Sequence, residues 1–204
     1  YNGKTLMQML ETIPIDQDHN WSDGRFPVQY VVRPHLEKYH DYRGYAGRVD
    51  GGTFKTGDEI TVLPAGITTT IKSLKLFDED VDIAYPPMSV TMELSDDIDI
   101  SRGNLFVKGG QLPLSGQDIE LMVCWMDEKP LSLNGRYNLR HTTGDLKCVV
   151  KEVLYKVNVN NLEEIRDHSP VKFNDIARIR IRTSRPLFYD PYTRNRKTGS
   201  LILV

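Results

Sequence analysis

Residues 58–77, DEITVLPAGITTTIKSLKLF, decide the fold of this chain. Apolar and polar residues alternate in Asp58–Pro64 and again in Ile67–Phe77, and Ala65-Gly66 lies between the two runs. Alternation with a period of two is typical of a strand with one buried face, and a short turn containing glycine joins such strands as a hairpin. This stretch therefore predicts an antiparallel β-hairpin.

The same alternation recurs on both sides of the hairpin. Runs of this kind at a spacing of about 8–12 residues are typical of barrels and sandwiches, whereas crossover folds place helices between their strands. We therefore expect an all-β fold of two consecutive antiparallel β-barrels, preceded by one short helix. The other main strands are expected at Phe26–Arg33, Met88–Leu94, Asp118–Met126, Gly135–Thr142, Leu146–Val157, Ala177–Thr183 and Gly199–Val204.

The boundary between the two barrels is expected within Gln111–Gly116, where a proline and a glycine interrupt the alternation. Residues 23–112 then form the first barrel and residues 113–204 the second, while residues 1–22 hold a helix and a linker. A chain of 204 residues with 39% hydrophobic content is long enough to bury a core in each barrel.

The expected helix lies near residue 1. Leu6, Leu10 and Ile13 fall at positions i, i+4 and i+7, which share one helix face, and Pro14 ends the pattern. This apolar face has no obvious partner within the sequence, so we expect it to be the last helix of a domain that precedes residue 1. The polar segment Asp16–Arg25 that follows is interpreted as a linker.

Composition excludes several classes of protein. A formal net charge of −2 provides no global attraction to nucleic acid or to an anionic membrane. No apolar run approaches the ~18 residues of a membrane span, and residues 1–20 lack the basic and apolar blocks of a signal peptide. Cys124 and Cys148 lie in strand-like runs and are expected to be buried free thiols. We therefore expect a cytoplasmic protein without a membrane partner.

Charge is distributed unevenly along the chain. Phe77–Ile100 contains eight acidic residues and no lysine or arginine. Arg166–Val204 contains nine basic residues and three acidic ones. The two segments are expected to carry local fields of opposite sign.

No complete catalytic or cofactor-binding motif is present. Gly3-Lys4-Thr5 resembles the end of a phosphate-binding loop, but the earlier glycine and strand that such a loop needs are missing. Asp78–Asp82 has aspartates at the spacing of a calcium loop, but Ile83 stands where glycine is required and Ser89 where glutamate is required. We interpret these stretches as a helix start and a solvated acidic turn.

The loop Pro34–Tyr42 holds His35 and His40 close to acidic and aromatic residues, so a metal or catalytic site there is the weaker alternative. The histidines of the chain show no metal-ligand spacing. We assign no catalytic, cofactor-binding or metal-binding residue, and expect this chain by itself to be inactive as an enzyme.

Three arginines alternate with isoleucines in one expected strand. Arg178, Arg180 and Arg182 therefore lie on one face of that strand, while Ile179 and Ile181 lie on the buried face. Such a row can bind carboxylates or phosphates through paired N–H donors. The alternatives are a solvated outer face and a contact with an acidic partner or domain. Because no aromatic residues stand among the arginines, RNA is the less expected partner.

The order of motifs resembles the second and third domains of translation-factor-type GTPases of the Tu class. Within that superfamily the chain is most similar to the large, GTP-binding subunit of heterodimeric sulfate adenylyltransferase. The resemblance covers nearly the whole chain. It rests on Phe26–Val31, Arg43–Val49, Gly57–Pro64, Asp99–Gly103, Val123–Met126, Pro130-Leu131, Tyr155–Asn158, Asn160–Leu162, Pro186-Leu187 and Thr198–Ile202.

The resemblance implies a function in sulfate assimilation. In that family a GTPase subunit couples GTP hydrolysis to adenylyl transfer from ATP onto sulfate, and a small partner subunit carries the transfer chemistry. GTP and Mg²⁺ would bind in an N-terminal domain that lies outside this sequence, and ATP would bind in the small subunit. Partners of this chain would be that GTP-binding domain and the small subunit.

Two turns are candidate contacts with a partner or domain. The glycine-rich Arg43–Gly52 and the turn Asp99–Gly103 indicate a contact around Arg43 and Arg102. The equally weighted alternative is that Arg102 pairs locally with Asp97 or Asp99. Two other functions also remain open: the domains of a translation elongation factor that bind aminoacyl-tRNA, and a stand-alone interaction module of an unrelated barrel family.

Overall fold

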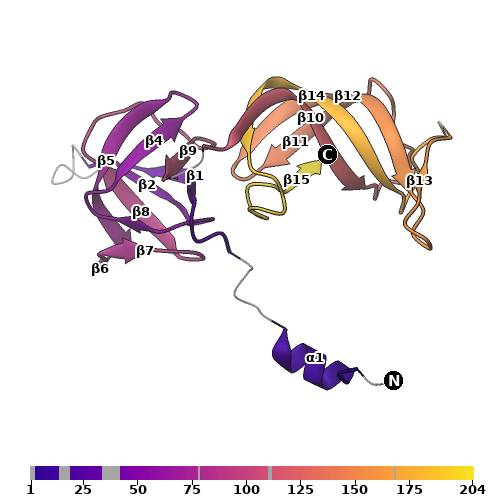
Figure 1. The fold of residues 1–204 in the computed structure, drawn as a ribbon. Coiled ribbons are helices and arrows are strands. Elements are labelled where there is room, and N and C mark those ends of the chain that lie inside the picture. The colour runs from indigo at the N-terminus through magenta and orange to yellow at the C-terminus, as the bar shows by residue number, and fades with distance from the viewer. Residues whose placement is uncertain (1–2, 14–18, 34–41, 78, 110–111, 168) are drawn as a thin grey trace.

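The computed structural model describes residues 3–13, 19–33, 42–77, 79–109, 112–167 and 169–204. Figure 1 shows two β-domains and, at the N-terminal end, one helix that lies away from both. The alternative site at His35 and His40 falls outside the described residues, as does Asp78 of the acidic turn.

The first domain is a closed antiparallel barrel. Its hydrogen-bonded order is β4-β9-β1-β2-β8-β5, and β4 also pairs with β5, which closes the ring. The short β6 extends from β5, and β3 pairs with β7. The bounds are β1 (Gly24–Val32), β2 (Gly44–Arg48), β3 (Phe54–Lys55), β4 (Glu59–Leu63), β5 (Ile67–Leu76), β6 (Glu79–Asp80), β7 (Ile83–Ala84), β8 (Ser89–Leu94) and β9 (Leu105–Lys108).

The predicted hairpin of residues 58–77 is confirmed as β4 and β5. Val62 pairs with Ile67, and the Gly66 amide donates a 2.8 Å hydrogen bond to the Val62 carbonyl. Gly66 has a φ of +72°, a left-handed conformation that glycine adopts without steric cost. The glycine of the turn signal is therefore required by the backbone.

Aromatic rings fill the centre of the first barrel. Phe26 stacks on Phe106 with ring centroids 5.6 Å apart, and Tyr45 meets Phe106 edge-on at the same separation. All three residues are 0–1% exposed. Each ring of this size removes a large apolar area from water, so the cluster fixes β1, β2 and β9 around one core.

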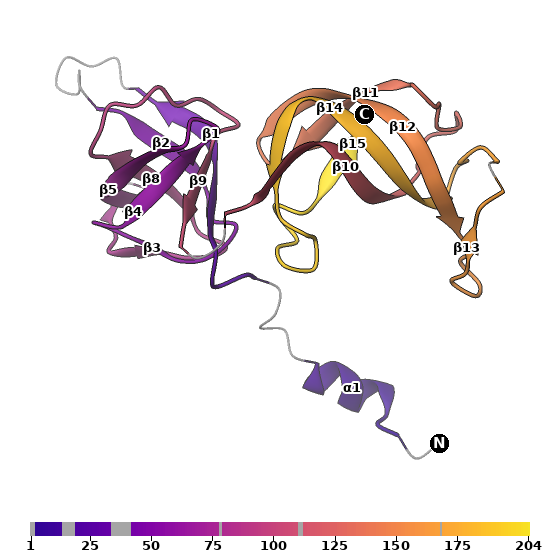
Figure 2. The same ribbon diagram turned by 45° about the horizontal axis from the view of Figure 1, so that its top comes forward.

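The second domain is a strongly curved antiparallel sheet, as Figure 2 shows. Its order is β10-β14-β12-β11-β15, and β13 pairs with β12. The bounds are β10 (Leu114–Cys124), β11 (Arg136–His141), β12 (Gly144–Val157), β13 (Glu164–Ile165), β14 (Ile176–Tyr189) and β15 (Leu201–Leu203). The expectation of an all-β chain with two consecutive barrel domains is confirmed, with the second domain as a half-barrel.

Burial alternates along the strands of the second barrel as the sequence predicts. Ala177, Ile179 and Ile181 of β14 are 0% exposed, and the arginines between them lie on the outer face. Cys148 is buried, but Cys124 is exposed, so the expectation of two buried thiols is wrong for Cys124. The reason is strand parity: Cys124 shares the outer face of β10 with Glu120 and Met122.

The helix α1 spans Leu6–Thr12 and begins with a capping box between Thr5 and Gln8. None of its residues is buried, and the apolar residues of its predicted face are exposed. In the described part of the chain, no helix is both long enough and apolar enough to cross a membrane.

The interpretation of Asp16–Arg25 as a linker is wrong for the end of that segment. Asp23 is 3% exposed, Arg25 is 0% exposed, and β1 begins at Gly24. A linker keeps its polar side chains in solvent, whereas these two charged side chains are withdrawn from it. Their partners, which lie in the second barrel, define the site described next.

Candidate functional site

The N-terminal end of β1 is held against a pair of glycines. The Arg25 amide donates to the Gly51 carbonyl at 3.0 Å, and the Gly52 amide donates to the Asn20 carbonyl at 2.7 Å. A Cβ atom at Gly51 would lie 2.6 Å from the carbonyl oxygen of Asp23, and Gly52 has a φ of +60°. Glycine is therefore needed at both positions, and the close approach fixes where Asp23 and Arg25 point.

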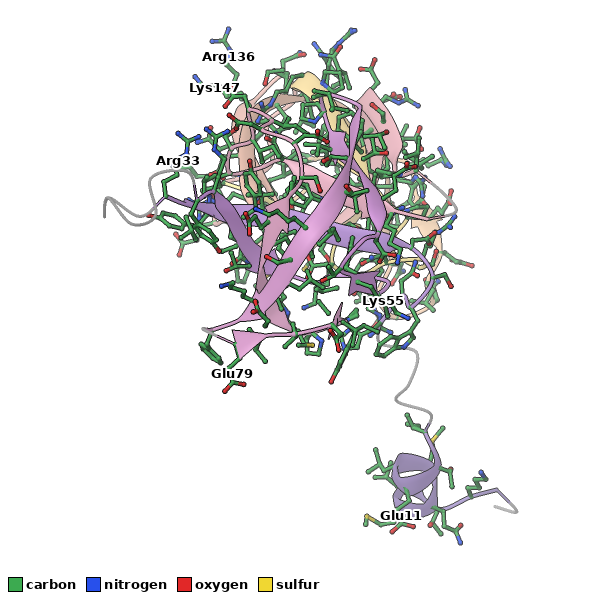
Figure 3. The ribbon with its side chains drawn as sticks, turned by 90° about the vertical axis from the view of Figure 1, so that its left-hand side faces the viewer. Glu11, Arg33, Lys55, Glu79, Arg136 and Lys147 are labelled. Carbon is green, nitrogen blue, oxygen red and sulfur yellow. The ribbon has the colours of Figure 1, made fainter. Side chains whose placement is uncertain are left out.

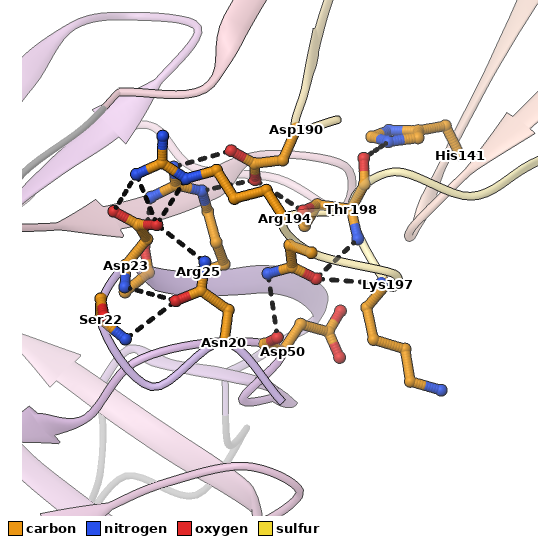
Figure 4. Close-up of polar contacts among 12 residues, drawn as sticks. Asn20, Ser22, Asp23, Arg25, Asp50, His141, Asp190, Arg194, Lys197 and Thr198 are labelled. Carbon is orange, nitrogen blue, oxygen red and sulfur yellow. Dashed lines mark hydrogen bonds and ion pairs between the residues drawn. The ribbon is translucent and has the colours of Figure 1, made fainter. Parts of the chain in front are cut away.

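The Arg25 guanidinium forms a paired contact with Asp190 across the junction of the two barrels (Figure 4). Arg25 Nε lies 2.8 Å from Asp190 Oδ2, and Arg25 Nη2 lies 3.0 Å from Oδ1. Arg25 Nη1 donates to the Gly24 carbonyl at 2.9 Å. The two side chains are 0% and 4% exposed, so this is a fully buried, geometrically matched ion pair.

Two further residues of the second barrel extend the contact. Thr198 Oγ1 donates to Asp190 Oδ2 at 2.6 Å, and His141 Nε2 lies 2.7 Å from the Thr198 carbonyl oxygen. Because a carbonyl oxygen only accepts, Nε2 carries the proton. Burial lowers the pKa of His141, although the Thr198 carbonyl and the Asp190 charge act in the opposite direction. His141 is therefore a neutral donor near pH 7.

A second ion pair crosses the junction beside the first. Arg194 Nε and Nη2 lie 2.8 and 2.9 Å from the Asp23 carboxylate, which also accepts from Asn20 Nδ2 at 2.7 Å. Burial acts to raise the pKa of Asp23, but the hydrogen bonds from Asn20 and Arg194 outweigh it, so the pKa is lowered. Asn195 Nδ2 adds a third contact, 3.2 Å from the Asp50 carbonyl.

A compact turn in the second barrel presents these groups. The Gly199 amide donates to the Asn195 carbonyl at 2.8 Å, and Asn195 Oδ1 accepts from the amides of Lys197 and Thr198. A Cβ atom at Gly199 would lie 2.6 Å from the Cα atom of Tyr192, so the turn closes only with glycine there. We call the set formed by Asn20, Asp23, Arg25, Asp50, His141, Asp190, Arg194, Asn195 and Thr198 the junction network.

The chemistry of the junction network is positioning. Its two ion pairs neutralise their charges; Asp23, Arg25 and Asp190 are buried, and Arg194 is partly exposed. No group of three metal-ligating side chains occurs among the described residues. Breaking a buried pair leaves an uncompensated charge, which costs about 3–5 kcal/mol. The network is therefore suited to hold the two barrels as one rigid body.

Arg102, predicted as a candidate contact, lies in a cleft next to this network. The cleft has a volume of about 430 Å³ and contains residues of both barrels, among them Arg102, Arg185 and His141. Arg102 Nη1 donates to the Gln29 carbonyl at 3.2 Å. The side chain is exposed, so Arg102 is accessible to a partner at the mouth of this cleft.

Arg43, the other predicted contact in the first barrel, is engaged locally. Its Nη1 atom contacts the Asp97 carboxylate and donates to the Ile98 carbonyl at 3.2 Å. The pairing with Asp97 that was the alternative for Arg102 is thus made by Arg43. Arg43 and Arg102 remain predicted contacts, since no partner is present in the structure.

The three arginines of β14, which we call the outer arginine row, contact acidic residues of the neighbouring strands. Arg178 Nη2 lies 3.0 Å and Arg180 Nη2 lies 2.8 Å from Glu120, and Arg180 Nη1 lies 2.6 Å from Glu152. Arg182 is held less closely, with Nε 3.7 Å from Asp118. Hydrogen bonds from Arg180 and Arg178 lower the pKa of Glu120.

Sequence reasoning did not find the junction network. Arg25 and Asp190 are 165 residues apart, and neither lies in a motif with a regular spacing. The available signal was indirect: the Gly51-Gly52 pair indicates that another segment approaches closely. It did not indicate which segment approaches.

The comparisons first define the class of protein. Residues 118–204 match the family described as GTP-eEF1A C-terminal domain-like. The crystal structure of Sup35 complexed with GDP covers all of this chain and 49% of its own, with a TM-score of 0.79 and 12% identity. Translation elongation factor SelB from Methanococcus maripaludis covers 91% of this chain and 39% of its own, with a TM-score of 0.64 and 17% identity. The two domains thus have the translation-factor barrel fold.

Curated relatives then identify the family. Sulfate adenylyltransferase subunit 1 of Bacteroides thetaiotaomicron is 41% identical and that of Bacteroides fragilis 43% identical over the whole of this chain. The bifunctional enzyme CysN/CysC of Mycobacterium tuberculosis is 41% identical. The chain belongs to the family of sulfate adenylyltransferase subunit 1. It spans 43%, 42% and 33% of the length of these three relatives.

Proposed function

We propose that this chain forms the two non-catalytic barrels of the GTP-binding subunit of a sulfate adenylyltransferase. In this role it couples GTP hydrolysis to the synthesis of adenosine 5'-phosphosulfate from ATP and sulfate. The observation that carries the proposal is the identity of 41–43% to sulfate adenylyltransferase subunit 1 over the whole chain. Free thiols at Cys124 and Cys148 suit the cytoplasm, where we place the protein.

The junction network gives this role a physical basis. Two barrels joined by buried ion pairs rotate together, so a displacement at one barrel is transmitted to a partner bound at the other. Without the network, the same displacement would be absorbed by movement at the junction. We therefore assign the coupling function to the pair of barrels as a unit.

Nucleotide chemistry is assigned to other parts of the enzyme. Gly3–Thr5 precedes an exposed helix of seven residues, and no cluster of three or more His, Cys, Asp or Glu side chains that could hold a metal ion occurs among the described residues. These residues do not fit a nucleotide with its metal ion. We place GTP and Mg²⁺ in a GTP-binding domain outside this sequence, and ATP in the small subunit.

The partners are proposed to be the GTP-binding domain and the small catalytic subunit. Arg43 and Arg102 are the proposed contacts in the first barrel, and the outer arginine row is the proposed contact in the second. Of the two arginines of the first barrel, Arg102 is proposed to contribute more to partner binding. Its side chain is exposed at the cleft, whereas that of Arg43 is engaged with Asp97.

The test uses the full-length protein that contains this sequence, together with the small subunit from the same organism. Co-purification and GTP-stimulated formation of adenosine 5'-phosphosulfate are the expected results. Arg102→Ala should weaken binding of the small subunit or its stimulation by GTP, whereas Lys55→Ala, an exposed cation of the same barrel, should change neither. Binding of aminoacyl-tRNA with no binding of the small subunit would instead identify a translation factor.

A further inference from the structure

A hollow on the outer surface of the second barrel gathers four cationic side chains. It has a volume of about 470 Å³ and is lined by residues of β11, β12 and β14, including Arg136, Lys147, Lys151 and Arg182. Figure 3 shows Arg136 and Lys147 projecting outward from the same part of this barrel. We call this site the basic hollow.

The strand register explains why these side chains meet. Arg136 of β11 and Arg182 of β14 both pair with Val149 of β12, so the three residues form a row across the sheet. Lys147 lies two residues before Val149, and Lys151 lies two residues after it, at an irregularity in register between Val150 and Glu152. Both lysines are exposed, and both line the hollow. The cations therefore surround a central valine.

The charges of the basic hollow are not compensated as those of Arg178 and Arg180 are. Within the described part of the chain, no carboxylate lies within ion-pair distance of Arg136, Lys147 or Lys151, and Arg182 has one acidic neighbour, 3.7 Å away. On the same sheet, Arg178 and Arg180 share Glu120 at 3.0 and 2.8 Å, and Arg180 also contacts Glu152 at 2.6 Å. Like charges gathered without counter-charges repel one another, so an anionic group that binds there relieves this repulsion.

The dimensions of the basic hollow favour an extended anion. With about 3.3 Å per residue along a strand, and an irregularity at Lys151 that shortens the span, the backbone positions of Lys147 and Lys151 lie at most about 13 Å apart. With about 4.8 Å between strands, those of Arg136 and Arg182 lie about 10 Å apart. A ligand that uses all four cations thus carries several negative groups spaced around an apolar centre that contacts Val149.

These features distinguish a protein segment from nucleic acid. An apolar centre with a charged rim is the usual anatomy of a protein interface. Single-stranded nucleic acid needs aromatic rings free to stack on bases. The one aromatic residue that lines the hollow, Tyr137, packs edge-on against Trp125 at 5.7 Å, and its hydroxyl accepts from the Ser132 amide.

We propose that the basic hollow is a docking site for an acidic segment of a partner protein, in which glutamates or aspartates flank one apolar residue. The carboxylates contact Arg136, Lys147, Lys151 and Arg182, and the apolar residue packs on Val149. This site lies on the outer face of the second barrel, apart from the junction network. It does not depend on the proposed function.

The test measures binding of a fluorescent decapeptide of glutamates around one central leucine to the whole chain at low salt. Lys147→Glu/Lys151→Glu should weaken binding by about tenfold or more. Lys129→Glu/Lys172→Glu makes the same change of net charge with exposed lysines outside the hollow, and should change the affinity less than about twofold. Thermal unfolding of both variants should match that of the unmodified chain, because all four lysines are exposed.

Three results would overturn the proposal. One is an equal loss of peptide binding in the two variants, which would show attraction to net charge alone. The second is tighter binding of a labelled oligouridine of equal charge, which would identify a nucleic-acid site. The third is no measurable binding of the peptide to the unmodified chain at low salt.

Discussion

Arg25 and Arg180 both contact carboxylates through two nitrogens, yet they occupy opposite surroundings. Arg25 is 0% exposed and joins the two barrels, whereas Arg180 lies 42% exposed on the outer face of one sheet. Water and salt screen the second contact and leave the first almost unscreened. The same side-chain chemistry therefore joins two domains in one region and contributes little to stability on the exposed surface of the other.

The comparison also separates paired from unpaired cations. Arg25, Arg194, Arg178 and Arg180 have carboxylate partners within 3.0 Å. In the basic hollow, Arg182 has one at 3.7 Å, and the other three cations have none among the described residues. A cation without a close counter-charge keeps its full charge available to an anionic ligand. Substitutions in these regions test whether the contribution of each ion pair to stability follows its burial.

Arg25→Met should have the largest effect. It leaves the Asp190 carboxylate buried with Thr198 as its remaining donor, so the free energy of unfolding should fall by about 3–5 kcal/mol. Because the lost contact joins the barrels, we expect calorimetry to resolve two unfolding transitions for the variant and one for the unmodified chain. Unfolding in urea followed by tryptophan fluorescence measures the same loss.

A double variant separates loss of the contact from burial of an unpaired charge. Arg25→Met/Asp190→Leu removes both charges, and should recover part of the lost stability while the barrels still unfold separately. Full recovery of a single transition would contradict the assignment of this pair as the connection between the barrels.

Arg194→Met should have a smaller effect, because the Arg194 side chain is 35% exposed. Asp23 would lose two charge-assisted hydrogen bonds but keep the one from Asn20. We expect a loss of about 1.5–3 kcal/mol in the free energy of unfolding, measured in urea. Asp23→Asn should give a loss of similar size. If Arg194→Met lowered the free energy of unfolding as much as Arg25→Met does, burial would not determine which ion pair contributes more to stability.

His141 should make stability depend on pH. Its pKa is lowered in the folded state, so below the ordinary value of 6.5 the unfolded chain binds a proton that the folded chain does not. The free energy of unfolding should then fall as the pH falls, by up to about 1.36 kcal/mol per pH unit, or about 1 kcal/mol between pH 7.5 and 5.5. The matched variant is His141→Gln, which can donate to the Thr198 carbonyl but does not titrate. If the free energy of unfolding of this variant changed with pH as that of the unmodified chain does, His141 would not be the source of the pH dependence.

Local patterns predicted the strands because their cause is local. Alternation in Ile67–Phe77 reports which face of β5 is buried, and the glycine of Ala65-Gly66 reports a left-handed turn. Strand parity likewise placed the outer arginine row on the solvent face of β14. The same parity places Cys124 on the exposed face of β10. The expectation that it is buried followed instead from the general tendency of cysteine to be buried.

The junction network could not be predicted in the same way. Arg25 follows a polar segment, and its sequence context is that of a solvent-exposed arginine. It meets Asp190 only because the two folded domains lie against each other. The glutamate partners of Arg180 also come from other strands, 60 and 28 residues away in the chain. Periodicity identifies which face a residue lies on, whereas its partner across strands depends on register and topology.

Arg180→Ala should have the smallest effect on stability. Exposed ion pairs contribute about 0.2–1 kcal/mol, and Glu120 retains Arg178 as a partner when Arg180 is removed. The free energy of unfolding should fall by less than about 1 kcal/mol, and the fall should shrink further in high salt because the contact is screened. Urea unfolding at two salt concentrations measures both effects. A loss as large as that expected for Arg25→Met, and insensitive to salt, would mean that the outer arginine row stabilises the fold as much as the buried junction network does. Burial would then not explain the difference between the two regions.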